Sequence, residues 1–209
     1  MGYEYDEVYR GYDIMANEYV KVDDKIMNRI IDLVEFYAYN YSKTFVVTFG
    51  LNFSESDYSY DNKPIEKFMD RFLKYLDNKT NGLRPLYFWV REKKPDRRNH
   101  HYHVTLLLDG NRINSIYGIM EVAKRIWSDI NNYSSSYVYY GKEHCMMLRA
   151  DSPTFRQDIA DCIFRLSYYA KVNSKNTYAS RGRRWAASQV PPIFGKYVYA
   201  RTNCFALSC

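Results

Sequence analysis

Apolar and polar positions follow two different periods along this chain. In four segments the apolar residues recur every three or four positions, and this spacing predicts amphipathic helices at residues 23–40, 62–77, 115–131 and 152–172. Short apolar runs rich in β-branched and aromatic residues lie between them and predict strands at residues 44–53, 86–92, 101–108 and, less regularly, 137–148. Residues 1–21 are polar, rich in tyrosine and weakly patterned, and we predict no element there.

The order of these elements from residue 44 onward is β-α-β-β-α-β, followed by a further helix. This order predicts an α+β fold of the ferredoxin-like type, the split βαβ arrangement of helices and an antiparallel sheet. In that topology the first and third strands are central, and the second strand is an edge paired with the third. We divide the chain into an N-terminal extension with a helix (1–42), a central domain (43–175) and a basic, aromatic C-terminal segment (176–209).

Composition narrows the choice of partner and compartment only slightly. The formal net charge of +6 is consistent with a polyanionic partner, and aromatic residues interleaved with basic ones suit stacking on unpaired bases. A compositional bias explains the 23 tyrosines equally well. The acidic N-terminus lacks the apolar core of a signal peptide, no apolar stretch approaches the roughly 20 residues that span a bilayer, and the cysteines show no CxxC spacing. We therefore expect a cytoplasmic protein without a membrane partner.

Three of the four histidines of the chain fall within four positions, at the start of a predicted strand. Because alternate side chains of a strand share a face, His101 and His103 point the same way, and Tyr102 points into a core on the other side. Two imidazoles on one face of a rigid strand can bind one divalent cation, although histidines at this spacing are more often simply polar residues at the mouth of a strand. His100 has the opposite parity, or lies in the loop, and we expect at best an outer or DNA-facing role. His144 stands alone and is expected to be structural.

A carboxylate can complete this site from the preceding strand. That strand ends at Glu92, and a short polar loop with Pro95-Asp96 as turn residues returns the chain to the histidines, as in a hairpin. Cross-strand neighbours on one face lie only about 5 Å apart, so Glu92 can lie beside the histidine pair. We therefore predict a metal site formed by His101, His103 and Glu92, with coordination positions left for a substrate oxygen and water.

The last predicted helix carries two adjacent tyrosines near its end. Its apolar positions form a stripe, which consists of Ile159, Cys162, Ile163, Leu166 and Ala170. At about 100° per residue, Tyr168 projects nearly opposite this stripe, Tyr169 lies on its flank, and Lys171 shares a side with Tyr168. Tyr168 is thus a candidate nucleophile with Lys171 as a cationic helper, although an ordinary exposed tyrosine is the simpler interpretation. If the stripe packs directly on the sheet, Tyr168 points away from the histidines, so Tyr169 is the alternative nucleophile.

Together these motifs resemble the HUH endonuclease superfamily. Its hallmark is His-hydrophobic-His on the central strand of a ferredoxin-like sheet, a third polar metal ligand, and a later helix with Tyr-x-x-Lys. The matching residues here are His101-Tyr102-His103, Glu92 and Tyr168-Tyr169-Ala170-Lys171. Within the superfamily, residues 43–195 are most similar to the inovirus-type replication initiators of filamentous phages and prophages. The middle residue of the histidine motif, Tyr102, is aromatic rather than aliphatic, and we expect it to be buried without a functional penalty.

The resemblance implies an enzyme that nicks and joins single-stranded DNA at a replication origin through a 5′-phosphotyrosine intermediate. Such an enzyme initiates rolling-circle replication of a phage or plasmid-like element. It further implies that Tyr168 attacks the scissile phosphate with help from Lys171, and that Mn²⁺ or Mg²⁺ is held by His101, His103 and Glu92. The chain contains no P-loop motif, so a host helicase and a host polymerase would act with it in the bacterial cytoplasm.

Two clusters flank the predicted site and are candidates for contacts with DNA. They comprise Lys93, Lys94, Arg97 and Arg98 in the hairpin loop, and Arg181, Arg183, Arg184 and Trp185 after the tyrosine helix. Two alternatives remain open. One is a non-catalytic module that binds single-stranded nucleic acid on the same scaffold, and the other is a transposase or relaxase with the same chemistry.

Overall fold

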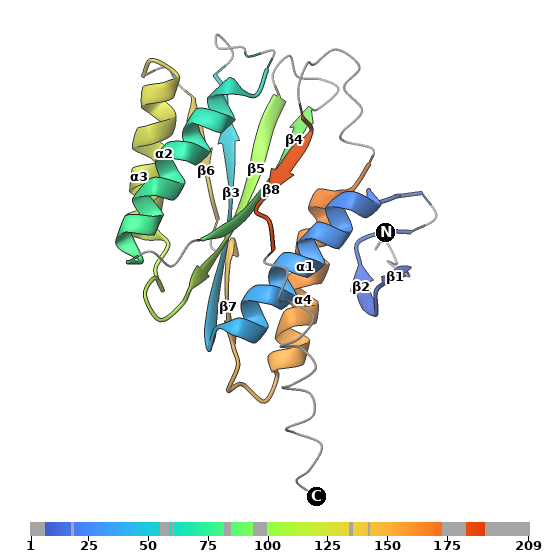
Figure 1. Ribbon diagram of the computed structural model, residues 1–209. Helices are drawn as coiled ribbons and strands as arrows, with labels where there is room; N and C mark the ends of the chain where they lie inside the picture. Colours follow the sequence, from blue (N-terminus) through green and yellow to red (C-terminus); the bar gives the residue numbers. More distant parts are fainter. Residues whose placement is uncertain are drawn as a thin grey trace, which may run out of the picture.

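A six-stranded antiparallel sheet forms the middle layer of this computed structural model, between two pairs of helices (Figure 1). The structure describes residues 7–17, 19–54, 59, 61–81, 85–93, 100–133, 136–141, 143–172 and 183–190. In this part of the chain, no helix combines the length and the apolar character that crossing a membrane requires.

The strands of the sheet follow the predicted topology. Their spatial order is β6 (Tyr137–Tyr139), β3 (Lys43–Asn52), β5 (His100–Asp109), β4 (Leu86–Lys93) and β8 (Trp185–Ala187). A further strand, β7 (Cys145–Arg149), pairs with the first half of β3, whereas β6 pairs with its last residues, so that β6 and β7 together form one edge. The first and third strands of the predicted unit, β3 and β5, are central, and the antiparallel α+β fold with a split βαβ arrangement is confirmed.

Two details of the sheet differ from the prediction. The single strand predicted for residues 137–148 is two strands, because the chain turns between β6 and β7. The prediction that residues 86–92 form a sheet edge was wrong, because β8 from the C-terminal segment pairs with β4 on its outer side.

One face of the sheet is covered by α2 (Lys63–Lys79) and α3 (Tyr117–Ile130). The residues of β5 that point this way, Tyr102, Val104, Leu106 and Leu108, are fully buried in a core that includes Phe68 and Trp127 of the two helices. Burial of this alternating set fixes the register of β5, since a slip by one residue would place the histidines in the core instead.

The other face carries His101 and His103 and is called the histidine face below. It is covered by α1 (Asp24–Asn40) and α4 (Phe155–Ser167). The predicted stripe of α4, including Ile163 and Leu166, packs with Val90 and Leu107 of the sheet, and the apolar residues of α1 belong to the same core. The α1 helix, which lies within the predicted N-terminal extension, therefore packs directly on the sheet.

The predicted last helix changes its geometry just before the two tyrosines. The α-helix ends at Ser167, and residues Tyr168–Ala170 form a single 3₁₀ turn, η1. The Ser167 hydroxyl donates to the carbonyl of Phe164 and accepts from the backbone N–H of Met15, so this end is tied to the N-terminal region. The tighter turn sets the directions of the side chains that follow.

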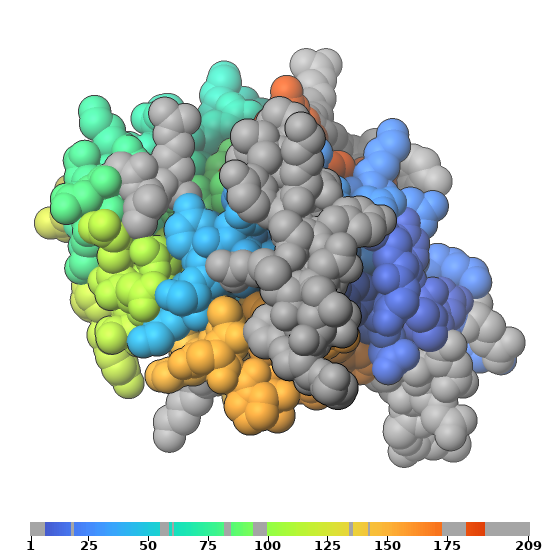
Figure 2. Space-filling view, turned by 60° about the horizontal axis from the view of Figure 1, so that its bottom comes forward, coloured from blue at the N-terminus to red at the C-terminus, as the bar shows by residue number. Residues whose placement is uncertain are grey.

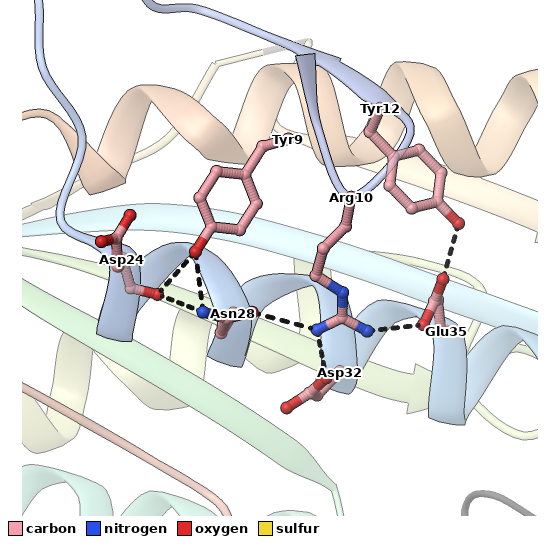
Figure 3. A network of polar contacts seen from close by, with 7 residues as sticks. All are labelled: Tyr9, Arg10, Tyr12, Asp24, Asn28, Asp32 and Glu35. Atoms are coloured by element: carbon pink, nitrogen blue, oxygen red, sulfur yellow. Dashed lines mark hydrogen bonds and ion pairs between the residues drawn. The ribbon is translucent and has the colours of Figure 1, made fainter.

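An N-terminal hairpin of β1 (Glu7–Tyr9) and β2 (Tyr12–Ile14) lies where no element was predicted. Its turn residues Arg10 and Gly11 both have positive φ, as a two-residue type I′ turn requires. Figure 3 shows how the hairpin is held on α1: the Arg10 guanidinium contacts Asp32 at 2.7 Å and Glu35 at 3.4 Å, and the Tyr12 hydroxyl donates to Glu35.

At the end of the molecule that faces the viewer in Figure 2, three segments lie side by side: the turn after β5, the start of β3 and the turn before α4. The N–H of Gly110 donates to the carbonyl of Lys43, and the N–H of Ala150 donates to that of Ser42. The histidines begin β5 and therefore lie at the opposite end of the sheet, near its top in Figure 1.

Candidate metal centre

Glu92, His101 and His103 converge at one point on the histidine face. Glu92 of β4 lies directly opposite His101 in the strand register, as the hairpin pattern predicted. The Nε2 atoms of the two histidines are 3.0 Å apart, and the Glu92 Oε2 atom lies 3.2 Å from Nε2 of His103 and 3.8 Å from Nε2 of His101. Within the described residues, these three side chains form the group that could hold a metal ion.

The donor atoms fit a divalent cation in both chemistry and spacing. Nitrogen and oxygen ligands about 2.1 Å from an ion lie roughly 3.0 to 3.4 Å from one another in tetrahedral or octahedral geometry. The distances between the two Nε2 atoms and between His103 and Glu92 are in or near that range, and the distance between His101 and Glu92 is slightly longer. Three protein ligands leave further coordination positions, as a catalytic site requires.

The site is closed behind the carboxylate and open beside the imidazoles. The Glu92 side chain is 7% exposed, whereas those of His101 and His103 are 15% and 23% exposed. The charge of the buried Glu92 carboxylate favours a cation at this point, since a buried charge is costly unless it is paired. A ligand can therefore approach from the histidine side, with Glu92 at the base of the site.

His100 points to the opposite face of the sheet and is buried there. Its Nε2 atom lies 3.0 Å from the Tyr102 hydroxyl, and its ring packs edge-on against Phe53. Burial lowers the pKa of His100 to about 4, and the nearby positive charge of Arg91 acts in the same direction, so this imidazole is neutral at physiological pH. His100 therefore supports the strand from behind, rather than facing a substrate on the histidine face.

Tyr169 packs directly against a metal-ligand candidate. Its ring centroid is 4.9 Å from that of His103, with 35° between the ring planes. Burial raises the pKa of Tyr169, a hydrogen bond with Thr48 has the opposite effect, and the negative charge of Glu92 raises the pKa further. Thr48 lies two residues from Gly50, the β3 neighbour of His103, on the side away from His101. The Tyr169 hydroxyl is therefore directed along β3 and away from the centre of the site.

Tyr168 and Lys171 form a second pair beside Tyr169. Tyr168 is 44% exposed, and its ring packs edge-on against that of Tyr169 at 5.7 Å. The Nζ atom of Lys171 lies 4.5 Å from the centre of the Tyr168 ring. Partial burial lowers the pKa of Lys171, and the negative charge of Glu92 acts in the opposite direction. Lys171 therefore interacts electrostatically with Glu92 and also contacts Tyr168, the more exposed of the two tyrosines.

Half of the residues predicted to contact DNA belong to the described part of the chain. Lys93 ends β4 and lies opposite His100, and Arg183 and Arg184 are exposed immediately before β8. Trp185 is half-buried on the histidine face, opposite Val90 of β4. The other four, Lys94, Arg97, Arg98 and Arg181, lie outside the described residues.

Two residues near the site were not predicted to contribute to it. Tyr137 and Tyr139 of β6 are 51% and 58% exposed, and their cross-strand partners on β3 are Asn52 and Gly50. The alternation Tyr-Val-Tyr indicated a strand with both tyrosines on one face. The pairing of that strand with β3, which brings the tyrosines to the histidine face, is a long-range contact that the local pattern does not reveal.

Comparison with known proteins gives one match. Residues 5–184 match the family model described as the YagK/YfjJ C-terminal domain, so the chain belongs to that family. No curated protein and no solved structure matches the chain.

Proposed function

We propose that this member of the YagK/YfjJ C-terminal domain family nicks and joins single-stranded DNA through a phosphotyrosine intermediate, with the help of a divalent metal ion. We further propose that it thereby initiates rolling-circle replication of a phage or plasmid-like element. One observation carries the proposal: two adjacent tyrosines and a lysine lie beside a histidine–histidine–glutamate cluster that could hold a metal.

Glu92, His101 and His103 would hold the ion, and their mixed oxygen and nitrogen donors suit Mn²⁺ or Mg²⁺ in cells. A bound cation of this kind polarises a non-bridging oxygen of a phosphodiester and neutralises charge that develops in the transition state. Because these ligands lie on two neighbouring strands of one sheet, the chain holds them in a fixed arrangement, which in-line phosphoryl transfer requires.

Tyr168 is the nucleophile in this proposal. Its phenol is accessible to a DNA strand, whereas Tyr169 is partly buried and hydrogen-bonded to Thr48. The phenolic oxygen forms a bond to phosphorus while the bond from phosphorus to the 3′ oxygen breaks. The phenol loses its proton and the departing 3′ oxygen gains one, which leaves a 5′-phosphotyrosine link and a free 3′-hydroxyl. The reverse reaction joins DNA ends without ATP.

Lys171 and Tyr169 assist this step in different ways. The Lys171 ammonium contacts the Tyr168 ring and would stabilise negative charge on the phenolic oxygen and the phosphate. Tyr169 is a positioning residue, because its ring lies between that of Tyr168 and that of His103 and contacts both.

The test uses the full chain and a pool of single-stranded oligonucleotides of random sequence, labelled at the 3′ end, with Mn²⁺ or with EDTA. A denaturing gel should show a labelled protein adduct that requires Mn²⁺. Tyr168→Phe should abolish it, and Tyr169→Phe, the matched control, should retain it. An excess of unlabelled oligonucleotide with a free 3′-hydroxyl should release the label as a longer DNA strand.

The other outcomes are equally informative. Loss of the adduct in Tyr169→Phe alone would retain the enzyme and reassign its nucleophile. DNA binding without an adduct under any metal condition would overturn the proposal and favour the non-catalytic binding module.

A further inference from the structure

The edge strand β6 carries an exposed pair of aromatic side chains. Tyr137 and Tyr139 are each more than half exposed, whereas Val138 between them is 9% exposed and packs into the core with α2 and α3. Leaving two large aromatic rings in contact with water is unfavourable compared with burying them. The position of the pair relative to the candidate metal centre gives it a use.

The strand register places both tyrosines in line with the metal ligands. Tyr139 lies opposite Gly50, which in turn lies opposite His103. Tyr137 lies opposite Asn52, which lies opposite His101. Directly opposed residues share a face, so the tyrosines lie on the histidine face, two strands or roughly 10 Å from the histidines.

The β3 residues between the tyrosines and the histidines on this face are Gly50 and Asn52. Gly50 has no side chain, and a Cβ atom built there would lie 3.5 Å from Nδ2 of Asn52 and 3.9 Å from the Cβ atom of Tyr139. Both neighbouring side chains therefore lie on the same face as this position. Asn52 is the neighbouring residue in the other row. The row through Gly50 is therefore the lower path from the histidines to β6, and the amide of Asn52 lies beside it.

From this arrangement we infer that Tyr137 and Tyr139 form a stacking surface for the unpaired bases next to the phosphate bound at the metal centre. The inference rests on the proposed function and adds the path of the strand. A single strand presents a base face at every nucleotide, and an aromatic ring can stack on any base without reading its sequence. The strand would thus run across β5 and β3 toward the β6 edge, perpendicular to the strands of the sheet.

A single-stranded nucleic acid fits this surface better than a protein partner does. The tyrosines are continuous with a site whose metal ligands and Lys171 suit a phosphate, and the chain carries a net charge of +6. Two tyrosines that are still more exposed, Tyr117 and Tyr133, lie in or just after α3, a helix that covers the other face of the sheet. They provide a matched control for the effect of removing surface aromatics.

The experiment measures fluorescence anisotropy of a labelled 15-nucleotide oligo(dT), with Mn²⁺, in a Tyr168→Phe background that prevents covalent chemistry. Tyr137→Ala/Tyr139→Ala should weaken binding by about thirtyfold or more, because two base–aromatic stacks are lost and each usually contributes about five- to a hundredfold. Tyr117→Ala/Tyr133→Ala should leave the affinity unchanged, and Tyr137→Trp/Tyr139→Trp should restore it. Affinity for Mn²⁺ alone, measured by calorimetry, should be the same in all variants.

An abasic oligonucleotide of the same length separates stacking from phosphate contacts. It should bind the parent protein and Tyr137→Ala/Tyr139→Ala equally, because it has no bases to stack. Equal affinity of the parent and this double variant for oligo(dT) would overturn the inference, as would an equal loss for the abasic strand. If adducts form but the double variant binds normally, the stacking surface is wrong and the proposed nuclease stands. If stacking is found but no adduct forms, the nuclease is wrong and the stacking surface stands.

Discussion

The imidazole of His103 and the phenol ring of Tyr169 pack against each other with their centroids 4.9 Å apart and their planes tilted by 35°, although the two residues come from the central strand and from the last helical turn. This contact joins the metal-ligand cluster to the tyrosine segment. Tyr168 then follows on the exposed side, with its ring against Tyr169 and the Lys171 ammonium above it.

Removal of the Tyr169 ring should therefore affect both stability and the geometry of the site. Tyr169→Ala should lower the free energy of unfolding by about 2 to 3 kcal/mol, below the range for a fully buried aromatic ring because this ring is partly buried. Tyr169→Phe retains the packing and removes the hydrogen bond with Thr48, at a cost of about 1 kcal/mol. Urea denaturation of both variants checks this. A cost below about 1 kcal/mol for Tyr169→Ala would show that the ring is not packed as described.

Glu92→Gln should weaken the binding of Mn²⁺ at least tenfold. The substitution removes the charged oxygen ligand that lies within 3.2 Å of His103 but retains the shape of the side chain. Isothermal titration calorimetry with the metal alone measures the effect, and Glu143→Gln, an exposed glutamate outside the cluster, is the control. Equal loss in both variants would contradict the assignment of Glu92 as a ligand.

His100 should make the protein less stable in mild acid. Its pKa is lowered to about 4 in the folded protein, whereas an unfolded histidine titrates near 6.5, so the unfolded chain binds more protons between these values. Stability from this group is fully present above about pH 6.5 and is lost as the pH falls toward 4, by roughly 3 kcal/mol in total.

Denaturation curves at pH 7 and pH 4.5 give the free energy of unfolding of the native chain and of His100→Gln. The difference between the two proteins at each pH tests this pH dependence. Glutamine is polar and neutral at both values, so the variant should lose less stability on acidification. The same difference at the two values would show that His100 is not the group responsible.

Arg183 and Arg184 should bind DNA phosphates at the β8 edge. Both are exposed, and the carbonyl of Arg184 accepts from the N–H of Arg91, which fixes the segment against β4. Arg183→Ala/Arg184→Ala should weaken binding of single-stranded DNA and lower the slope of log affinity against log salt by about 1.4, at about 0.7 for each phosphate that the variant no longer neutralises.

Affinity measured over a series of salt concentrations provides the slope. Lys67→Ala/Lys74→Ala, which removes two exposed charges from α2 on the other side of the sheet, should leave the slope unchanged. An unchanged slope in the arginine variant would remove these residues from the DNA-binding surface.

The four long helices, the central strands and the metal-ligand cluster could be predicted from the residues alone. The period of the apolar residues predicted each helix and central strand, because burial of one face imposes that period locally. The alternation around Tyr102 placed His101 and His103 together on the other face, and the short hairpin loop placed Glu92 beside them. All of these relationships depend on neighbours in one strand or one hairpin, which a local pattern can encode.

The surroundings of this cluster depend instead on how the whole chain packs. The addition of β8 to β4, the pairing of β6 with β3, and the hairpin packed on α1 join segments far apart in the chain. Packing of the α4 stripe on the sheet likewise decides which tyrosine meets the cluster: Tyr169 contacts the ring of His103 and Tyr168 stays exposed. These features depend on which surfaces pack against one another. That choice is made by the complete fold, because it involves residues far apart in the chain, and no single stretch of sequence encodes it.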